Sequence, residues 1–218
     1  MKTKSQPLIA KEGWGAVAVT LAVALAATWL AGWWSLPCWL ALVFVLQFFR
    51  DPKRTVPQGE GLVVAPADGK VVFAGRAEDP YLRRPALMVS VFMNVFSVHA
   101  NRAPLAGEVR RIKYFPGKFF NAALDKSSAQ NERNMMWIHG DGGADVVCVQ
   151  IAGLIARRIL CHASPHQRLH TGQRYGFIRF GSRVDLYLPE HAQLKIKLGD
   201  KVRGGADVVA ELRPPPPQ

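Results

Sequence analysis

The sequence predicts a mainly β fold, a barrel- or sandwich-like β domain that follows an N-terminal hydrophobic, helical membrane-anchoring segment. Two long apolar runs occupy most of the first 50 residues. From Gly61 onward helical periodicity is scarce, and short alternating segments separated by turn residues replace it. Short strands at regular spacing are typical of sandwiches and barrels. With 218 residues, 49% of them hydrophobic, the chain suits one domain with an appendage.

The N-terminal segment, residues 1–50, is predicted to be a membrane anchor. Residues 14–34, WGAVAVTLAVALAATWLAGWW, carry no charge and are long enough to cross a bilayer as a helix. A shorter apolar run follows over residues 38–49, and it could either cross the bilayer or lie in its interface. A signal peptide fits poorly, because the first run is long and continues into more apolar sequence. The anchor is therefore either one helix or a helical hairpin.

Basic residues flank the anchor on both sides. They are Lys2, Lys4 and Lys11 before it and Arg50, Lys53 and Arg54 after it. A hairpin with both ends in the cytoplasm satisfies the positive-inside rule on both flanks, whereas a single span leaves one basic flank outside. The sequence thus favours a hairpin in the cell (inner) membrane, with the domain that follows facing the cytoplasm.

The net charge of +12 points to an anionic partner. The basic residues are scattered and form no nucleic-acid reading motif, so an anionic phospholipid surface is the better match for an anchored chain. Cys38, Cys148 and Cys161 are an odd number without motif spacing, which indicates reduced thiols and agrees with a cytoplasmic domain.

The β-rich domain is predicted over residues 51–213, before a disordered Pro-rich tail at 214–218. The predicted strands are GLVV and GKVVFAG around a turn at Pro66–Gly69, then ALMVSVFM, GEVRRIKYF, NMMWIHG, ADVVCVQIAGLIARRIL, the stretch around Gly181-Ser182, LKIKL and DVVAEL. Residues 121–134 are expected to be a loop or a short helix. The segments GLVVAPADGKVV and LGDKVRGGADVVAEL echo each other in sequence, which is typical of half-barrels that exchange strands between two layers. Chance repetition of hairpin chemistry gives the same similarity.

The stretch YGFIRFGSRVDLYLP reads as one strand with a Gly-Ser pair inside it. Ile178 and Phe180 precede the pair, and Val184, Leu186 and Leu188 continue with the same parity. Glycine weakens a strand interior and marks a bulge or a close backbone approach. The pattern leaves both interpretations open.

A metal site is not predicted. His162, His166 and His170 have a spacing of four and would share one face of a helix. Pro165 within the stretch and Gly172 after it argue against a helix there, so a solvated loop is the better interpretation.

Asp68, His99 and Ser182 supply an acid, a base and a hydroxyl. Asp68 lies in the PADG turn, and His99 lies in a loop straight after an apolar strand. These are the groups of an activated serine, in which histidine takes the proton and aspartate orients the ring. No G-x-S-x-G elbow is present, and the nearest carbonyl to the Ser182 hydroxyl is that of Gly181. Attack there would permit an N-to-O acyl shift, elimination to dehydroalanine and hydrolysis to a pyruvoyl group.

Almost the whole chain resembles the short bacterial and archaeal-type phosphatidylserine decarboxylases. The resemblance is carried by FFRDPKR, VVAPADGKV, VFMNVFSVHANRAP, NERN, IAGLIARRI, RFGSRVDLYLP and GDKVRGG, in this order. It implies a proenzyme that cleaves itself between Gly181 and Ser182 into a β chain, residues 1–181, and an α chain, residues 182–218. Asp68 and His99 then fall at the family's acid and base of maturation.

The resemblance also implies the reaction. Ser182 would become the covalent pyruvoyl cofactor, form a Schiff base with the amine of phosphatidylserine and act as electron sink while carbon dioxide leaves, which yields phosphatidylethanolamine. Longer relatives carry a second histidine where this chain has Phe96, so either another group or His99 protonates the carbanion. FGSR here replaces their LGST and keeps the Gly-Ser pair.

Several properties stay open at the level of sequence. Arg102, Arg157 and Arg183 are phosphate candidates on charge alone. The oligomeric state and the acyl-chain preference are not readable, and a homo-oligomer is compatible with the sequence. The alternative function is a membrane-tethered β-barrel binding or carrier module without self-cleavage, although Lys70 and Lys201 lack the hydrophobic flanks of a carrier lysine.

Overall fold

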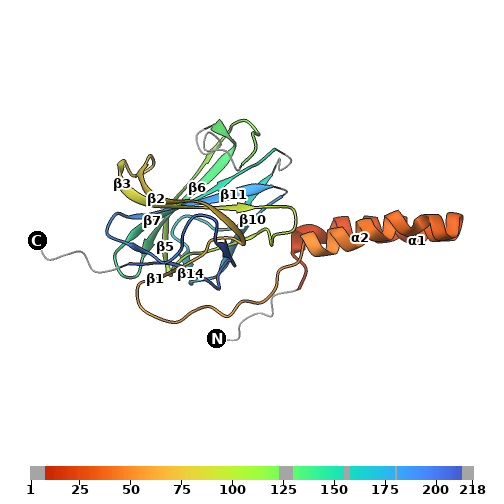
Figure 1. Ribbon diagram of the computed structural model, residues 1–218, viewed down its shortest axis with the longest axis horizontal. Helices are drawn as coiled ribbons and strands as arrows, with labels where there is room; N and C mark the ends of the chain where they lie inside the picture. The colour runs from red at the N-terminus through yellow and green to blue at the C-terminus, as the bar shows by residue number, and fades with distance from the viewer. Residues whose placement is uncertain (1–7, 123–129, 155–157, 180, 213–218) are drawn as a thin grey trace, which may run out of the picture. The chain divides into compact units, whose positions relative to one another are not determined.

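The computed structural model describes residues 8–122, 130–154, 158–179 and 181–212 (Figure 1). The chain divides into two compact units, Met1–Lys53 and Arg54–Gln218. The predicted Pro-rich tail lies outside the described residues, as does the central part of the predicted loop at 121–134.

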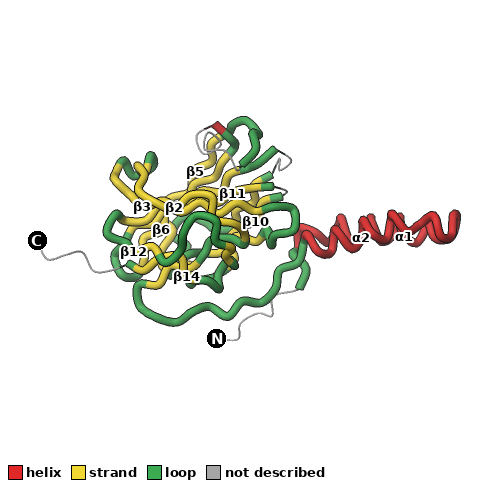
Figure 2. The backbone as a smooth tube through the Cα atoms, viewed as in Figure 1, coloured by secondary structure: helices red, strands yellow, loops and turns green. Residues whose placement is uncertain are grey.

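The first unit is a helical hairpin (Figure 2). Its elements are the 3-10 turn η1 (Lys11–Gly13), the helix α1 (Trp14–Ala31), the 3-10 turn η2 (Gly32–Ser35) and the helix α2 (Leu36–Phe48). The chain reverses at Gly32, whose φ of 52° lies in the region that glycine adopts without a steric penalty. At the open end, the Ala10 amide donates to the Phe49 carbonyl at 2.7 Å and the Asp51 amide donates to the Leu8 carbonyl at 2.7 Å. These bonds hold the two ends of the hairpin side by side.

The hairpin exposes apolar side chains on all sides. Trp29 is 86% exposed and Trp33 is 95% exposed. A helix that is apolar all round belongs in an apolar environment, because water does not solvate such a surface favourably. By length and composition, the helical segment Lys11–Phe48 could cross a membrane.

The second unit is built almost entirely of antiparallel strands. They are β1 (Leu62–Val64), β2 (Gly69–Asp79), β3 (Arg84–Met93), β4 (Ala100–Arg102), β5 (Gly107–Phe115), β6 (Arg133–Gly140), β7 (Asp145–Ile151), β8 (Ile159–Cys161), β9 (Arg168–Leu169), β10 (Arg174–Ile178), β11 (Ser182–Pro189), β12 (Gln193–Leu194), β13 (Lys201–Val202) and β14 (Val208–Glu211). Over the described residues they form an eight-stranded sheet, β13-β2-β3-β11-β7-β6-β5-β9, and two three-stranded sheets, β1-β14-β12 and β4-β10-β8. The large sheet curls into a half-barrel (Figure 1). The predicted mainly β fold is confirmed.

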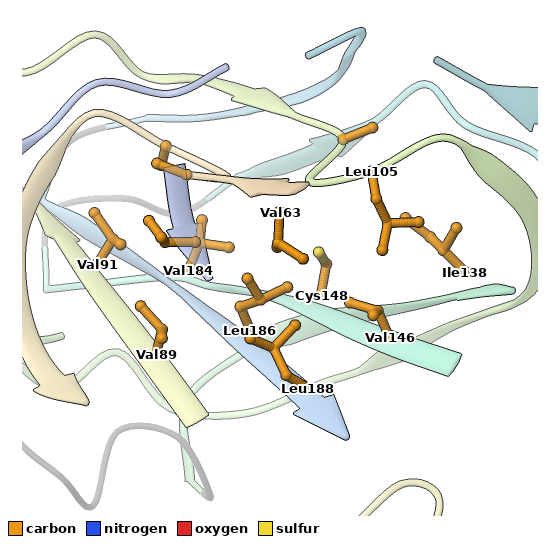
Figure 3. Packing of buried hydrophobic residues seen from close by; sticks show 14 of the residues in the cluster. Val63, Val89, Val91, Leu105, Ile138, Val146, Cys148, Val184, Leu186 and Leu188 are labelled. Atoms are coloured by element: carbon orange, nitrogen blue, oxygen red, sulfur yellow. The ribbon is translucent and has the colours of Figure 1, made fainter. Parts of the chain in front are cut away.

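Strand β11 lies in the middle of the large sheet, between β3 and β7. Side chains alternate between the two faces of a strand. Val184, Leu186 and Leu188 point into the main core, where they pack with valines of β3 and with Cys148 (Figure 3). On the other face Tyr187 belongs to a second apolar cluster. Both faces are covered, and every residue of β11 is buried.

Three strand predictions were wrong in detail. The predicted strand LKIKL, residues 194–198, is not formed, because β12 ends at Leu194. The Gly-Ser pair does not interrupt one strand, because β10 ends at Ile178 in a small sheet and β11 begins at Ser182 in the large one. Phe180 lies outside the described residues. The predicted strand over residues 144–160 is two strands, β7 and β8, because the chain leaves the large sheet after Ile151.

The echo between the two ends of the domain corresponds to pairing in space. Strand β1 pairs with β14, and β2 pairs with β13, so the first echoing segment lies against the second. The turn residues Pro66–Gly69 therefore separate strands of two different sheets and do not close a hairpin.

Candidate functional site

Ser182 is the first residue of β11 and is fully buried. It pairs with Met93, the last residue of β3, and its hydroxyl lies 4.0 Å from the Met93 sulfur. The central strand of the sheet therefore holds the candidate nucleophile rigidly in the protein interior. A buried hydroxyl whose described contact is a thioether loses little hydrogen-bonding energy when it reacts.

Gly181 has the geometry that the close-approach interpretation requires. Its φ is 60°, in the left-handed region. Its carbonyl oxygen lies so close to Gly153, just after β7, that a Cβ on Gly153 would be 1.6 Å from it. Only glycine at position 153 leaves room for this carbonyl. The structure thus fixes the Gly181–Ser182 peptide bond at both ends, by β11 on one side and by the backbone at Gly153 on the other.

A chain of buried amides lies beside Ser182. Asn134 Nδ2 donates to Gln150 Oε1 at 3.1 Å, and Gln150 Nε2 donates to Asn101 Oδ1 at 2.8 Å. Asn101 Nδ2 lies 3.8 Å from the same Met93 sulfur that the Ser182 hydroxyl approaches. Buried polar networks that satisfy their members rigidify a core, so this chain orders the end of the sheet around Ser182.

Asn131 fixes the loop that carries Gly153. Its side-chain amide donates to the Ala152 carbonyl at 2.7 Å and to the Phe120 carbonyl at 2.8 Å, and its Oδ1 accepts the Phe120 amide at 3.0 Å. Asn131 is fully buried. One side chain therefore ties residue 120 to residue 152, next to the contact between Gly153 and the Gly181 carbonyl.

His99 is fully buried just before β4. Its Nδ1 lies 2.9 Å from the Ser97 carbonyl oxygen, which can only accept, so Nδ1 carries the proton of the neutral ring and Nε2 is the basic nitrogen. The His99 carbonyl accepts the Ile178 amide at 3.3 Å, and the ring centroid lies 6.2 Å from that of Phe177. His99 is thus joined to β10, the strand that leads toward Gly181.

Asp68 is held by partners that the sequence did not indicate. Its Oδ2 accepts Arg54 Nη2 at 2.6 Å, and its Oδ1 accepts the Gly204 amide at 2.8 Å. Burial raises the pKa of Asp68 above its ordinary value, against the opposing effects of Arg54 and the Gly204 amide. In the described part of the chain no hydrogen bond joins Asp68 to His99, or His99 to Ser182. The structure brings the three residues into one unit without assembling them into a hydrogen-bonded triad.

Arg183 points to the sheet face opposite Ser182. It forms a bidentate ion pair with Asp185, with Nη2 at 3.0 Å from Oδ2, and both side chains are 1% exposed. Arg102 is also buried, and its Nη1 donates to the Gly172 carbonyl at 3.2 Å. These two phosphate candidates are thus buried and bonded within the protein, and Arg157 lies outside the described residues.

We expect Arg183→Met to destabilise the fold by about 3–5 kcal/mol, because it removes the ionic partner of a buried carboxylate. The double variant Arg183→Met/Asp185→Leu should recover most of this loss, since an apolar pair of similar volume has no charge to desolvate. Urea unfolding in a Ser182→Ala background, where the expected cleavage cannot divide the chain, measures both. A double variant no more stable than the single one would contradict this account of the pair.

Several contributors to the site were missed from sequence. Gly153, Asn131 and Asn101 lie in the motifs IAGLIARRI, NERN and SVHANRAP, but no role followed from their spacing. Phe96 is 65% exposed in the loop after β3. Over the residues that the structure describes, no group of three or more His, Cys, Asp or Glu side chains could hold a metal ion.

Comparison with known proteins gives a consistent result. Residues 41–210 match the family model for phosphatidylserine decarboxylase. The chain is 59% identical over 207 residues to the phosphatidylserine decarboxylase proenzyme of Nitrosomonas europaea, covering 94% of this chain and 96% of that protein. It is 54% identical over 207 residues to the proenzyme of Aromatoleum aromaticum and 53% identical over 209 residues to that of Burkholderia mallei, again covering 94% of this chain and 96% of each relative.

Proposed function

Because the chain belongs to the phosphatidylserine decarboxylase family, we propose that it is a proenzyme that cleaves itself between Gly181 and Ser182 and then decarboxylates phosphatidylserine. One observation carries the cleavage proposal. The Gly181 carbonyl lies against Gly153 in a left-handed backbone conformation, directly before a serine fixed at the start of a central strand. A glycine at a close backbone approach is one of the two interpretations that the sequence left open for this position.

The proposed cleavage needs only groups of this chain and water. The Ser182 hydroxyl attacks the Gly181 carbonyl carbon, and the peptide C–N bond breaks as the ester forms, so that the amine of residue 182 is released. A base then removes the Cα proton of residue 182, and the Gly181 carboxylate leaves from Cβ. The resulting dehydroalanine tautomerises to an imine, which water hydrolyses to a ketone and ammonia. His99 Nε2 is the proposed base, because hydrogen bonding of Nδ1 to Ser97 leaves Nε2 as the basic nitrogen.

The resulting pyruvoyl group fits the residues around it. It is made from Ser182 itself, at the buried end of β11. Its carbonyl would condense with the substrate amine and accept the electrons that remain when carbon dioxide leaves. Asp68 is proposed as the acid of maturation on the resemblance alone. The described partners of its carboxylate are Arg54 and the Gly204 amide, and neither belongs to the proposed reaction.

The helical hairpin is the proposed membrane anchor. Its length and all-round apolar surface suit a lipid environment. The basic residues at both ends support a cytoplasmic location for both, with the β domain on the same side of the cell membrane. Anchoring would keep the enzyme at the surface in which its lipid substrate is dissolved.

The proposed function is tested by measuring the masses of the polypeptides and the products formed from the lipid. We expect purified wild-type protein to give two polypeptides on denaturation, the smaller starting at residue 182 with a ketone in place of the amine. Incubation with phosphatidylserine labelled with ¹³C in the serine carboxyl group should release labelled carbon dioxide and form unlabelled phosphatidylethanolamine. A folded, intact chain that binds the lipid and leaves it unchanged would instead identify a binding module.

A further inference from the structure

A pocket of about 460 Å³ lies on the face of the large sheet opposite Ser182. Its lining side chains come from the end of β2 and the turn after it, from β5, from Arg133 and Met135 of β6, and from Tyr187 of β11. Tyr187 and Ser182 differ in parity along β11, so their side chains point to opposite faces. The proposed reaction makes no use of this pocket.

The pocket is strongly cationic. Four of its lining side chains are basic (Arg83, Arg111, Lys113 and Arg133), and one is acidic (Glu78). Arg111, Lys113 and Phe115 alternate along β5 and face the pocket together. This excess of positive charge attracts anions to the pocket.

Contacts within the pocket hold two of its cationic groups in place. Arg133 Nε lies 3.1 Å from the Tyr81 hydroxyl, and the Arg133 guanidinium lies 4.7 Å from the Phe115 ring centroid. Lys113 Nζ lies 4.9 Å from the same centroid. Stacking on an aromatic ring restricts the side chain and leaves N–H donors at its edge. These side chains are therefore ordered before an anion binds, which lowers the entropic cost of binding.

The turn between β2 and β3 forms one wall of the pocket. Tyr81 packs against Phe115 and Tyr187, with ring centroids 5.8 Å and 6.0 Å apart. Arg83 in this turn has a φ of 53°, a conformation that is unfavourable for a residue other than glycine. Arg84 Nη2 donates to the Asp145 carbonyl and ties the turn to the start of β7. A strained residue that brings a cation to the pocket agrees with a binding role.

We propose that this pocket binds a phosphate-type oxyanion, either a free phosphate or the headgroup phosphate of an anionic phospholipid. Arginine forks match tetrahedral oxyanions with paired hydrogen bonds, and lysine adds a point charge. The aromatic and methionine side chains provide an apolar wall for the glycerol part of a headgroup. Anion binding in this pocket does not require self-cleavage. A loss of anion binding and a loss of cleavage can therefore be observed separately.

The experiment uses the full chain in a neutral detergent. Titration calorimetry with inorganic phosphate reports the free anion. Native mass spectrometry after incubation with phosphatidylglycerol, against phosphatidylcholine, reports the lipid. Arg111→Gln removes a pocket cation, and Lys113→Gln is the second variant should the first fail to fold. Arg110→Gln is the matched control, because Arg110 is the preceding residue, carries the same charge and pairs with Glu108 outside the pocket lining.

We expect one saturable site, weakened about tenfold or more by the pocket variants and less than twofold by Arg110→Gln. Binding of phosphate alone assigns the site to a free anion, and selective retention of phosphatidylglycerol assigns it to a lipid headgroup. The absence of saturable binding for both probes would overturn the proposal. Equal weakening by Arg110→Gln and Arg111→Gln would overturn it too, because it would indicate diffuse attraction to a basic protein. Every variant should still be cleaved into two chains, with the larger one changed in mass only by its substitution.

Discussion

Ser182→Ala is expected to yield a single chain of 24.0 kDa, with decarboxylation at the background rate. Without the hydroxyl no ester forms at Gly181, and without the ester no ketone arises at residue 182. Both activities should therefore be lost together, by more than about 10³-fold. Intact-mass spectrometry and the lipid assay on one preparation measure the two losses.

The fold should tolerate this change. The described contact of the Ser182 hydroxyl is the Met93 sulfur at 4.0 Å, so its removal should alter the free energy of unfolding of the uncleaved chain by less than about 1 kcal/mol. Ser90→Ala is a matched control, since Ser90 is equally buried in the neighbouring strand β3, opposite Asp185. It should cleave and decarboxylate normally. A Ser182→Ala protein that still releases carbon dioxide would refute the proposed cofactor.

The mainly β fold followed from local patterns, because alternation and turn residues act over a few positions. Strand β5, Gly107–Phe115, coincides with the predicted segment GEVRRIKYF. Which strands pair does not follow from such patterns. Residues Ile178 and Val184 have the same parity, yet they belong to strands of different sheets. Period-2 alternation cannot distinguish one interrupted strand from two strands joined by a short connection.

The site was predictable where a residue's own chemistry pointed to it. Ser182 and Gly181 are a nucleophile and a flexible residue next to each other, and the family motifs singled out the same pair. Gly153 carries no functional group, and its role exists only because β7 pairs with β11 and brings its backbone to the Gly181 carbonyl. The bond from Arg54 to Asp68 and the burial of Arg183 are likewise products of tertiary packing.

Gly153→Ala tests the geometry that supports the cleavage proposal. The added methyl would lie 1.6 Å from the Gly181 carbonyl oxygen, and the nearest atoms are backbone atoms that cannot rotate away. Either the carbonyl or the loop after β7 must move by more than 1 Å, a displacement that can lower a rate about 100-fold. We expect self-cleavage to slow by at least about this factor. Pulse-chase labelling of the newly made chain measures the rate.

Two further glycine variants separate lack of space from backbone strain. Gly181→Ala adds a methyl with no atom within 4 Å, but it places an ordinary residue at a φ of 60°. That conformation costs roughly 1–2 kcal/mol, so cleavage should slow only about tenfold. Gly142→Ala also has no atom within 4 Å, lies outside the left-handed region and should cleave at the wild-type rate. The expected order of cleavage rates, from fastest to slowest, is therefore Gly142→Ala, Gly181→Ala and Gly153→Ala. If folded Gly153→Ala matured as fast as the wild type, the contact between Gly153 and the Gly181 carbonyl would have no part in bringing that carbonyl to the serine.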